Sequence, residues 1–255
     1  MSSSEMFGME FRQALKRLRL GPMRDTLPER IELARQQKMP YQDFLEVVFS
    51  DEVERRDRLG AQGRARRGNL DAQMILENWD ETAKVTFDRQ LWAELCTLRF
   101  LESHHHVLLL GPVGVGKTLL ATALGQIACR RGHPVHMMRA DKMLKELKAA
   151  RLDRTYDAEM RRLIRADLLI VDDLGLDQLD GDGSRDIYEI IVERHRAGSM
   201  IVTSNREPQE WLATMTDPLR AQSAIDRLQN AAYELVIEGE SYRKRQKPER
   251  RGAEK

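Results

Sequence analysis

The spacing of apolar residues changes along the chain, from a helical period in the first part to short, separated runs in the second. Up to Arg67 they recur at helical spacing, with interruptions at Gly21-Pro22 and Met39-Pro40, and this pattern predicts about three helices. From about residue 104 onward, short apolar runs alternate with segments long enough for helices, which is typical of a parallel sheet covered on both faces. We therefore predict an α/β fold with strands at residues 107–110, 135–138, 168–171, 200–203 and 233–237.

These patterns divide the chain into four parts. Residues 1–68 are expected to form a small all-helical domain for contacts with DNA, a partner or other subunits, and residues 69–103 to form a linker and bridging segment. Residues 104–242 hold the sheet, and residues 243–255 are a basic tail with the composition of a disordered segment. The helical part ends in the arginine-rich sequence RRDRLGAQGRARRGNL, whose glycines favour either a solvated hinge or a linker that binds phosphate groups.

Composition and charge exclude some classes of protein. No apolar run approaches the ~18 residues of a membrane span, so we expect no membrane contact and a cytoplasmic location. The net charge of +1 is unevenly distributed: Lys and Arg against Asp and Glu number 14 and 12 in residues 1–75, sum to −5 in residues 76–238, and number 7 and 3 in residues 239–255. A polyanionic partner would therefore meet local basic patches rather than a field of the whole protein.

The first predicted strand runs directly into a phosphate-binding sequence, GPVGVGKT, at residues 111–118. It matches the pattern G-x-x-x-x-G-K-[ST] between a strand and a helix, where backbone N–H groups curl around nucleotide phosphates. Lys117 is expected to reach the β- and γ-phosphate oxygens, and the Thr118 hydroxyl to ligate Mg²⁺. ATP and Mg²⁺ are therefore the expected cofactors. The expected phosphate-binding residues are Gly111, Pro112, Val113, Gly114, Val115, Gly116, Lys117, Thr118 and Leu119.

Two later strands end in polar residues that suit the same site. The third predicted strand, in ADLLIVDDLG, leads into Asp172, which we expect to hold Mg²⁺, and Asp173, which we expect to orient and polarise the attacking water. The fourth, in SMIVTSNRE, ends at Asn205, which would hold that water or sense the γ-phosphate. These roles require the fourth strand to lie between the first and the third. Without that order, a turn-forming Asn is the simpler interpretation.

These sequences together resemble the AAA+ ATPases. The segments LLLGPVGVGKT, MRRLIRADLLIVDDLG, SMIVTSN, SAIDRL and GESYRKR, in that order, are similar to those of IstB-type helper ATPases of insertion sequences, which are related to DnaC-type helicase loaders. The resemblance covers nearly the whole chain. It implies a parallel five-stranded P-loop sheet flanked by helices, ATP hydrolysis, and a homo-oligomer with nucleotide sites between subunits.

The resemblance also implies roles for two arginines. Arg227 in SAIDRL matches the arginine that similar proteins insert into the nucleotide site of the next subunit, where it offsets charge on the transferring phosphoryl group. Arg243 in GESYR stands where a second, nucleotide-sensing arginine would be expected. Two departures limit the comparison: Asp173 replaces the Glu of many AAA+ proteins, and the 17 residues from Gly239 onward are too few for a full C-terminal lid. Both favour a slow timing switch over a fast motor.

A candidate DNA contact comes after the second strand. In RADKMLKELKAARLDRTY a cation stands at every third position, so the set would wind around a helix and could follow a phosphate backbone across several subunits. Ordinary solvent-exposed lysines explain the pattern nearly as well. The candidate residues are Lys142, Lys145, Lys148, Arg151 and Arg154.

Other noticeable residues favour structural roles. The consecutive His104, His105 and His106 cannot converge on one metal ion from an incoming strand. Trp79, Trp92 and Trp211 are expected to pack rather than to stack on bases. No residue pattern identifies an adenine pocket.

The function expected from these features is that of an ATP-dependent helper of transposition. Such a protein would assemble on double-stranded target DNA with ATP, present the DNA to its cognate transposase, and leave on hydrolysis. One alternative is a DnaC-like replicative helicase loader, which would use its N-terminal helices to grip a helicase. Another is a P-loop kinase, but a kinase needs an acceptor pocket within one subunit, whereas SAIDRL indicates a site between subunits.

Overall fold

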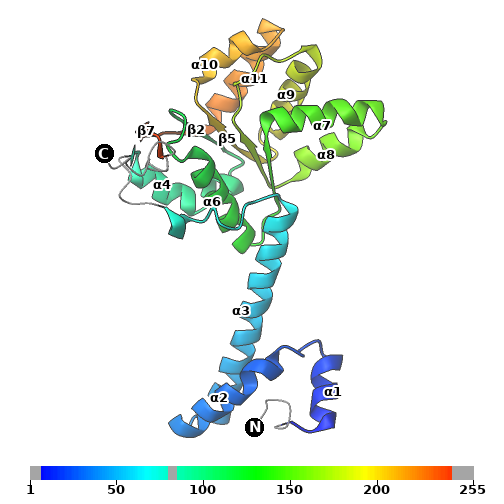
Figure 1. The fold of residues 1–255 in the computed structure, drawn as a ribbon, viewed down its shortest axis with the longest axis vertical. Helices are drawn as coiled ribbons and strands as arrows, with labels where there is room; N and C mark the ends of the chain where they lie inside the picture. Colours follow the sequence, from blue (N-terminus) through cyan, green and yellow to red (C-terminus); the bar gives the residue numbers. More distant parts are fainter. Residues whose placement is uncertain (1–6, 80–84, 243–255) are drawn as a thin grey trace, which may run out of the picture. The chain divides into compact units, whose positions relative to one another are not determined.

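The structure is a computed structural model that describes residues 7–79 and 85–242. The chain divides into two compact units, residues 1–60 and residues 61–255. The division falls within helix α3 (Tyr41–Arg67), before the expected domain boundary at residue 68 (Figure 1). In the described ranges no helix has both the length and the apolar character that crossing a membrane requires.

The first unit is helical, as the apolar spacing predicts. It contains α1 (Met9–Arg17), α2 (Met23–Gln37) and the part of α3 before residue 61. Side chains from all three helices meet in one small cluster, which explains why the period of the sequence is helical throughout. The buried members of this cluster are Leu15, Met23, Leu27 and Val48.

The expected linker at the end of the helical part is wrong, because α3 continues without a break to Arg67. Glycine within a helix costs about 1 kcal/mol relative to alanine, so packing has to hold this stretch in place. Ala61 and Ala65 are buried, and the Arg64 guanidinium donates a hydrogen bond of 2.8 Å to the carbonyl oxygen of Cys129. The arginine-rich run is therefore helical as far as Arg67.

The second unit is built on a five-stranded parallel sheet. Its strands are β2 (His106–Leu110), β3 (Val135–Arg139), β4 (Leu168–Asp172), β5 (Ser199–Ser204) and β6 (Ala232–Val236). Their order in the sheet is β3-β4-β5-β2-β6. All five predicted strands are confirmed, and β5 lies between β2 and β4 as the site requires.

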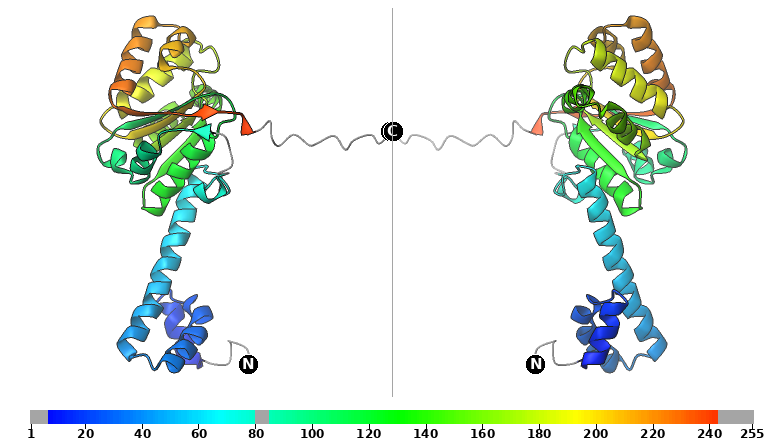
Figure 2. Two further views of the ribbon diagram at one scale, coloured as in Figure 1. Left: turned by 90° about the vertical axis from the view of Figure 1, so that its left-hand side faces the viewer. Right: turned by 90° about the vertical axis from the view of Figure 1, so that its right-hand side faces the viewer.

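Helices cover both faces of this sheet, in two layers (Figures 1 and 2). Because successive strand residues point to opposite faces, Leu109 and Ile170 pack into one core, whereas Leu108 and Leu169 pack into the other. The first face carries α4 (Arg89–Cys96), α5 (Arg99–Glu102) and α6 (Lys117–Arg130). The second carries α7 (Ala140–Leu152), α8 (Tyr156–Arg165), α9 (Gly181–Arg194), α10 (Pro208–Trp211), η2 (Leu212–Thr214) and α11 (Pro218–Asn230).

Short elements complete the second unit beside the carboxyl end of β2. The turn η1 (Leu76–Asn78) precedes β1 (Val85–Thr86), and β1 pairs antiparallel with β7 (Glu238–Gly239), which comes after β6. The backbone N–H of Tyr242 donates a hydrogen bond of 2.9 Å to the carbonyl oxygen of Gly114. The segment after β6 therefore lies against the loop between β2 and α6.

The register of the strands brings three chain segments to one edge. Leu110 of β2 stands opposite Ser204 of β5, and Val171 of β4 stands opposite Val202. Because the strands are parallel, the residues after β2, β4 and β5 all leave the sheet at this carboxyl edge, and the residues before the strands lie at the opposite, amino edge.

Candidate nucleotide-binding site

The loop between β2 and α6 depends on its glycines. Gly111, Gly114 and Gly116 have φ values of 145°, 86° and 99°, which residues with a side chain rarely adopt. A Cβ atom on Gly111 would also lie 2.0 Å from the carbonyl oxygen of Ile237. The turn leads directly into α6 at Lys117, so the free N–H groups of the first helical turn are available to an anion.

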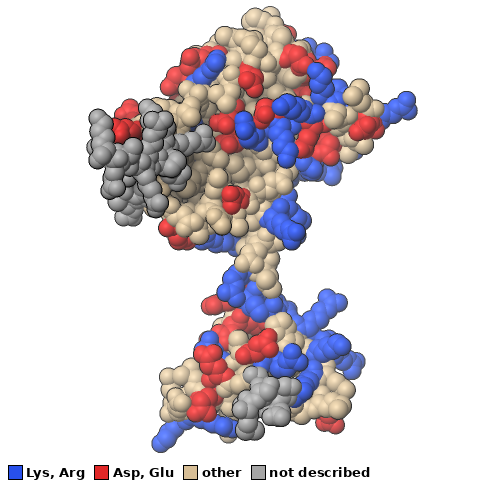
Figure 3. All heavy atoms as spheres, in the orientation of Figure 1, with Lys and Arg blue, Asp and Glu red and all other residues tan. Residues whose placement is uncertain are grey.

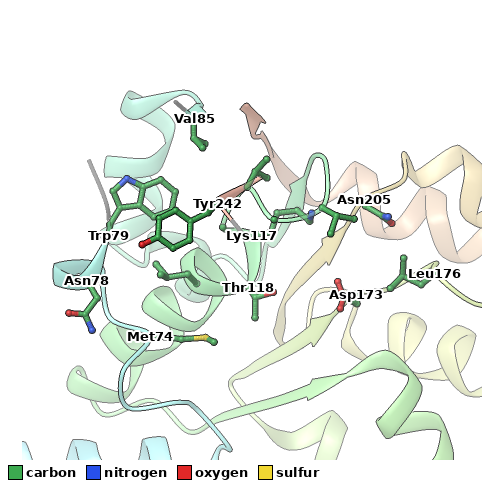
Figure 4. Close-up of a pocket in the computed structure, with 15 residues that line it drawn as sticks. Met74, Asn78, Trp79, Val85, Lys117, Thr118, Asp173, Leu176, Asn205 and Tyr242 are labelled. Carbon is green, nitrogen blue, oxygen red and sulfur yellow. The ribbon is translucent and has the colours of Figure 1, made fainter. Parts of the chain in front are cut away.

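Lys117 lies within this loop. Its Nζ donates hydrogen bonds of 2.8 Å to the carbonyl oxygens of Gly111 and Pro112. The side chain is largely buried, so its ammonium is held at a defined place beside the helix N-terminus (Figure 4). A phosphate group at the loop would meet both this charge and the backbone N–H groups.

Thr118 and Asp172 are in direct contact. The Thr118 hydroxyl donates to the Asp172 carboxylate, at 3.0 Å to Oδ1 and 3.2 Å to Oδ2. The Thr203 hydroxyl also donates to Asp172 Oδ1, at 2.6 Å, and accepts a hydrogen bond of 2.9 Å from the backbone N–H of Asp173. Thr203 thus fixes the Asp172 carboxylate and the Asp173 backbone. Its position within an apolar strand does not predict this role.

Burial raises the pKa of the Asp172 carboxyl above its usual value, although the hydrogen bonds from Thr203 and Thr118 act in the opposite direction. The side chain is only 4% exposed. A buried carboxylate beside a hydroxyl group is an oxygen-donor set of the kind that Mg²⁺ prefers. These residues therefore fit a magnesium ion, whose positive charge would favour the ionised carboxylate.

Asp173 has an unusual backbone conformation. Its φ of 59° places a non-glycine residue in the left-handed region, which costs of order 1 kcal/mol and is common at functional sites. The carboxylate lies 4.0 Å from the Arg139 guanidinium, which is 3.3 Å from Asp141. Unlike Asp172, Asp173 is partly exposed and lines the pocket.

Asn205 comes directly after β5 and lines the same pocket (Figure 4). It reaches the site because β5 separates β2 from β4, the strand order that its predicted role requires. The carboxamide therefore lies on the same side of the sheet edge as Asp173 and Lys117.

The phosphate loop opens into a pocket of about 410 Å³ that extends beyond it. At Gly116 an added Cβ would lie 2.7 Å from the Trp79 ring, so the indole packs directly over the loop. The local sequence did not reveal this part of the pocket. Its residues come from η1, from β1, from the residues beside these two elements, and from the segment after β7. Only long-range packing brings these segments together. These residues are Met74, Asn78, Trp79, Val85 and Tyr242 (Figure 4).

The two predicted arginines are not in this pocket. Arg227 lies in the last turn of α11, just before β6, and its guanidinium donates a hydrogen bond of 2.8 Å to the carbonyl oxygen of Ser223. That position is at the amino edge of the sheet, whereas the phosphate loop is at the carboxyl edge. Within one chain, Arg227 therefore does not reach the nucleotide pocket. Arg243 lies outside the described residues.

The candidate DNA-binding set differs from the expected winding row. Helix α7 ends at Leu152, so Arg154 lies beyond the helix, with φ of 59°. Arg151 forms a two-pronged ion pair with the buried Asp186 of α9, which makes it a contact of the fold rather than a free cation. The sequence could not reveal this pairing because Asp186 is 35 residues further along the chain.

The three lysines of α7 also have acidic neighbours. The pairs are Lys142 with Glu146 at 3.8 Å, Lys145 with Asp141 at 3.5 Å, and Lys148 with Asp180 at 3.0 Å. All three lysines are mostly exposed, and blue and red atoms alternate over α7 in Figure 3. Such exposed pairs are weak and exchange readily with other partners.

The proteins that are similar to this chain in sequence are ATP-binding proteins of insertion sequences. A family model of IstB-like ATP-binding proteins matches residues 13–250. An insertion-sequence ATP-binding protein of Mycobacterium tuberculosis is 35% identical over 240 residues, 94% of this chain and 96% of the relative. The IS21 ATP-binding protein of Pseudomonas aeruginosa is 31% identical over 238 residues, 93% of this chain and 90% of the relative.

Among solved structures, the DnaC helicase loader is similar in fold to part of this chain. The TM-score is 0.52 with 19% identity, and the match covers 58% of this chain and 87% of that chain. The strand order, the phosphate loop between β2 and α6, and the aspartate that ends β4 are those expected of an AAA+ ATP-binding core. On the family match over residues 13–250, the chain belongs to the IstB-like ATP-binding proteins.

Proposed function

We propose that the protein is an ATP-dependent helper of transposition that works in the cytoplasm. It assembles on double-stranded target DNA with ATP bound, presents this DNA to its cognate transposase, and is released on ATP hydrolysis. The observation that carries the proposal is the contact of Thr118 with Asp172 at the phosphate loop, in a chain whose relatives are insertion-sequence proteins.

In this function, Lys117 and the backbone N–H groups at the start of α6 hold the β- and γ-phosphates. Thr118 and Asp172 hold Mg²⁺, which offsets charge on the phosphates. Asn205 contacts the γ-phosphate or the attacking water. Metal binding requires the ionised form of Asp172, so the affinity for magnesium falls as the pH is lowered towards the raised pKa of this carboxyl.

Asp173 is proposed to orient the attacking water and to accept its proton. The strained backbone of Asp173 and the hydrogen bond from its backbone N–H to Thr203 support this role, because both fix the point of the chain from which the carboxylate extends. A carboxylate one methylene shorter than glutamate reaches less far, which favours slow hydrolysis. Slow hydrolysis suits a timing switch.

The far part of the pocket is proposed to bind the adenine base. Trp79 and Tyr242 supply aromatic faces, and Met74 and Val85 supply apolar surface, as a purine requires. The Asn78 carboxamide has a donor and an acceptor for the polar edge of the base. This lining supports ATP as the ligand.

Contacts between chains and with DNA complete the proposal. Arg227 is proposed to act on the nucleotide of the next subunit, since it lies at the opposite edge of the sheet from its own phosphate loop. Lys142, Lys145, Lys148 and Arg154 are proposed to contact the DNA backbone, whereas Arg151 holds α9 through Asp186. Arg243 is proposed to sense the nucleotide.

The test is copurification of the full chain with its cognate transposase on double-stranded DNA, with ATP, with ADP and without nucleotide. We expect a complex in ATP and its loss as ADP forms. Lys117→Ala is the nucleotide-free control. Equal recovery in all three nucleotide states would contradict the proposal.

The fold likeness to the DnaC helicase loader favours one rival, a role in helicase loading. Capture of the replicative helicase in place of transposase would support that rival. A P-loop kinase is the other rival, and it is distinguished by its product. Helper and loader both release ADP and inorganic phosphate, whereas a kinase transfers the phosphate to an acceptor molecule.

A further inference from the structure

A second pocket opens at the amino edge of the sheet. Its volume is about 590 Å³, and it is bounded by the residues before β2, the turn between α9 and β5, and the end of α11. These segments all stand where strands begin, on the side of the sheet opposite the phosphate loop. The polar residues that matter here are His105, His195, Arg196, Asp226 and Arg227.

Within the described residues, ion pairs do not balance the charge of this pocket. Arg196 and Arg227 both line it, and neither forms an ion pair with a carboxylate in residues 7–79 or 85–242. Asp226 is the one carboxylate in its described lining. His195 adds a buried Nδ1 for which the described part of the chain offers no hydrogen-bond partner. Two arginines in the lining of one cavity favour an anion there.

Arg196 is presented by a firmly held turn. It has φ of 62° and comes two residues after Arg194, whose guanidinium is fully buried. Arg194 donates hydrogen bonds of 2.8 Å and 2.7 Å to the carbonyl oxygens of Leu163 and Ile164, and another of 2.5 Å to Ser199. The turn is therefore tied to α8 on one side and to β5 on the other. Such anchoring limits the motion of Arg196 without using its charge.

The phosphate-loop pocket, in contrast, has few positively charged residues for the charge of its ligand. Lys117 is the single cationic residue among the described residues that line it. A nucleoside triphosphate carries several negative charges, so one lysine and a magnesium ion leave part of that charge to be offset. Two arginines that form no ion pair with a described carboxylate lie at the other edge of the same sheet. One chain cannot bring that edge to its own phosphate loop.

We propose that Arg196 acts together with Arg227 in trans, contacting phosphate oxygens of the nucleotide held by a second copy of this chain. The amino edge of one copy then faces the carboxyl edge of the next. This contact is head-to-tail, so it repeats from copy to copy. The proposal rests on the proposed ATPase function and adds a second arginine to it, from a different element of the fold.

The test compares Arg196→Ala, Arg196→Lys and Arg161→Ala, the last being an exposed arginine of α8 with no described partner. We expect Arg196→Ala to lower the DNA-stimulated kcat for ATP by about 10- to 100-fold, as loss of one charged hydrogen bond implies. Arg196→Lys should keep part of the kcat that Arg196→Ala loses. The ATP affinity of the isolated subunit should not change, because its own pocket is intact. Arg161→Ala should behave as wild type.

Mixing shows whether Arg196 acts across subunits. In an equal mixture of Arg196→Ala with Asp173→Asn, about a quarter of the interfaces join an intact Asp173 site to an intact Arg196. ATPase activity should therefore rise well above the average of the two separate proteins. A mixture no more active than that average, with mixed assembly verified, would overturn the proposal.

The outcomes also separate this inference from the proposed function. If wild type hydrolyses ATP and Arg227→Ala is inactive while Arg196→Ala is fully active, only the role of Arg196 is wrong. If the wild-type chain neither binds nor hydrolyses ATP, the proposed function itself is wrong.

Discussion

The two edges of the sheet differ in how far their polar groups are satisfied by the chain itself. At the carboxyl edge, Thr118, Asp172, Thr203 and the backbone of Asp173 form one connected set of hydrogen bonds. At the amino edge, the hydrogen bonds of the Arg227 guanidinium within the described residues go to Ser223 of its own helix. A parallel sheet keeps the segments that enter its strands apart from the segments that leave them. Under the proposed function, the reaction therefore needs two copies, each contributing one edge.

The largest expected effect comes from removing the cation of the amino edge. Arg227→Ala should bind ATP but hydrolyse it about a thousandfold more slowly, as for other arginines that reach a neighbouring phosphoryl group. Asp173→Asn should also be inactive, for loss of the water-orienting carboxylate. ATPase assays on DNA measure both.

Mixing the two inactive proteins in equal amounts should recover activity at about a quarter of the interfaces. Mixed assembly is verified by tagging one variant. If the mixture stays inactive, Arg227 acts within its own chain or takes no part in hydrolysis. The two edges of the sheet would then not combine between copies.

The next effect concerns the carboxyl edge. Lys117→Ala should weaken ATP binding about 100-fold, since a hydrogen bond to a charged group contributes up to about 3 kcal/mol. ATP-dependent assembly on DNA should disappear with it. An equilibrium titration measures the affinity, and a melting curve checks that the variant is folded. An unchanged dissociation constant would mean that the loop does not hold the phosphates.

A matched pair of glycines separates backbone strain from site function. Gly116, at the carboxyl edge, and Gly132, after α6 at the amino edge, have φ values of 99° and 98°. Alanine at either should cost about 1 kcal/mol of stability. At Gly116 the new Cβ also meets Trp79 at 2.7 Å, whereas at Gly132 there is nothing within 4 Å.

We therefore expect Gly116→Ala to lose several-fold in ATP affinity and Gly132→Ala to lose none. Chemical denaturation measures the stability of each, and nucleotide titration measures the affinity. Equal ATP affinity in the two variants would show that Trp79 does not confine the phosphate loop.

The smallest effect tests the surface of α7, which begins at the carboxyl edge. Replacing Lys145 and Lys148 by Ala should weaken DNA binding several-fold and reduce the salt dependence by about two phosphate contacts. The control is a double change of Arg161 and Arg165 on α8. Binding isotherms at several salt concentrations give the slope. An unaltered slope would show that the two lysines do not contact DNA and only form exposed ion pairs with Asp141 and Asp180.

Much of this protein can be predicted from local sequence. The phosphate loop can be predicted because phosphate binding needs residues that are consecutive in the chain: glycines with positive φ, and Lys117 at the start of the helix. No distant residue changes that requirement. Strands β2, β4 and β5 can be predicted because strands that are buried on both faces are rich in apolar residues. Asp172 and Asn205 are predicted on the same ground, since polar residues that end buried strands must meet at one edge.

Tertiary structure decided the rest, because those features depend on residues far apart in the chain. Thr203 holds the two aspartates only because β5 lies beside β4, and Trp79 reaches Gly116 only through the path of the segment before β1. The pairing of Arg151 with Asp186 and the hydrogen bond from Arg64 of α3 to Cys129 likewise depend on residues far away in the sequence. Local pattern determines what a short segment can do alone, whereas the partner of an exposed charge or an aromatic ring is chosen by the fold.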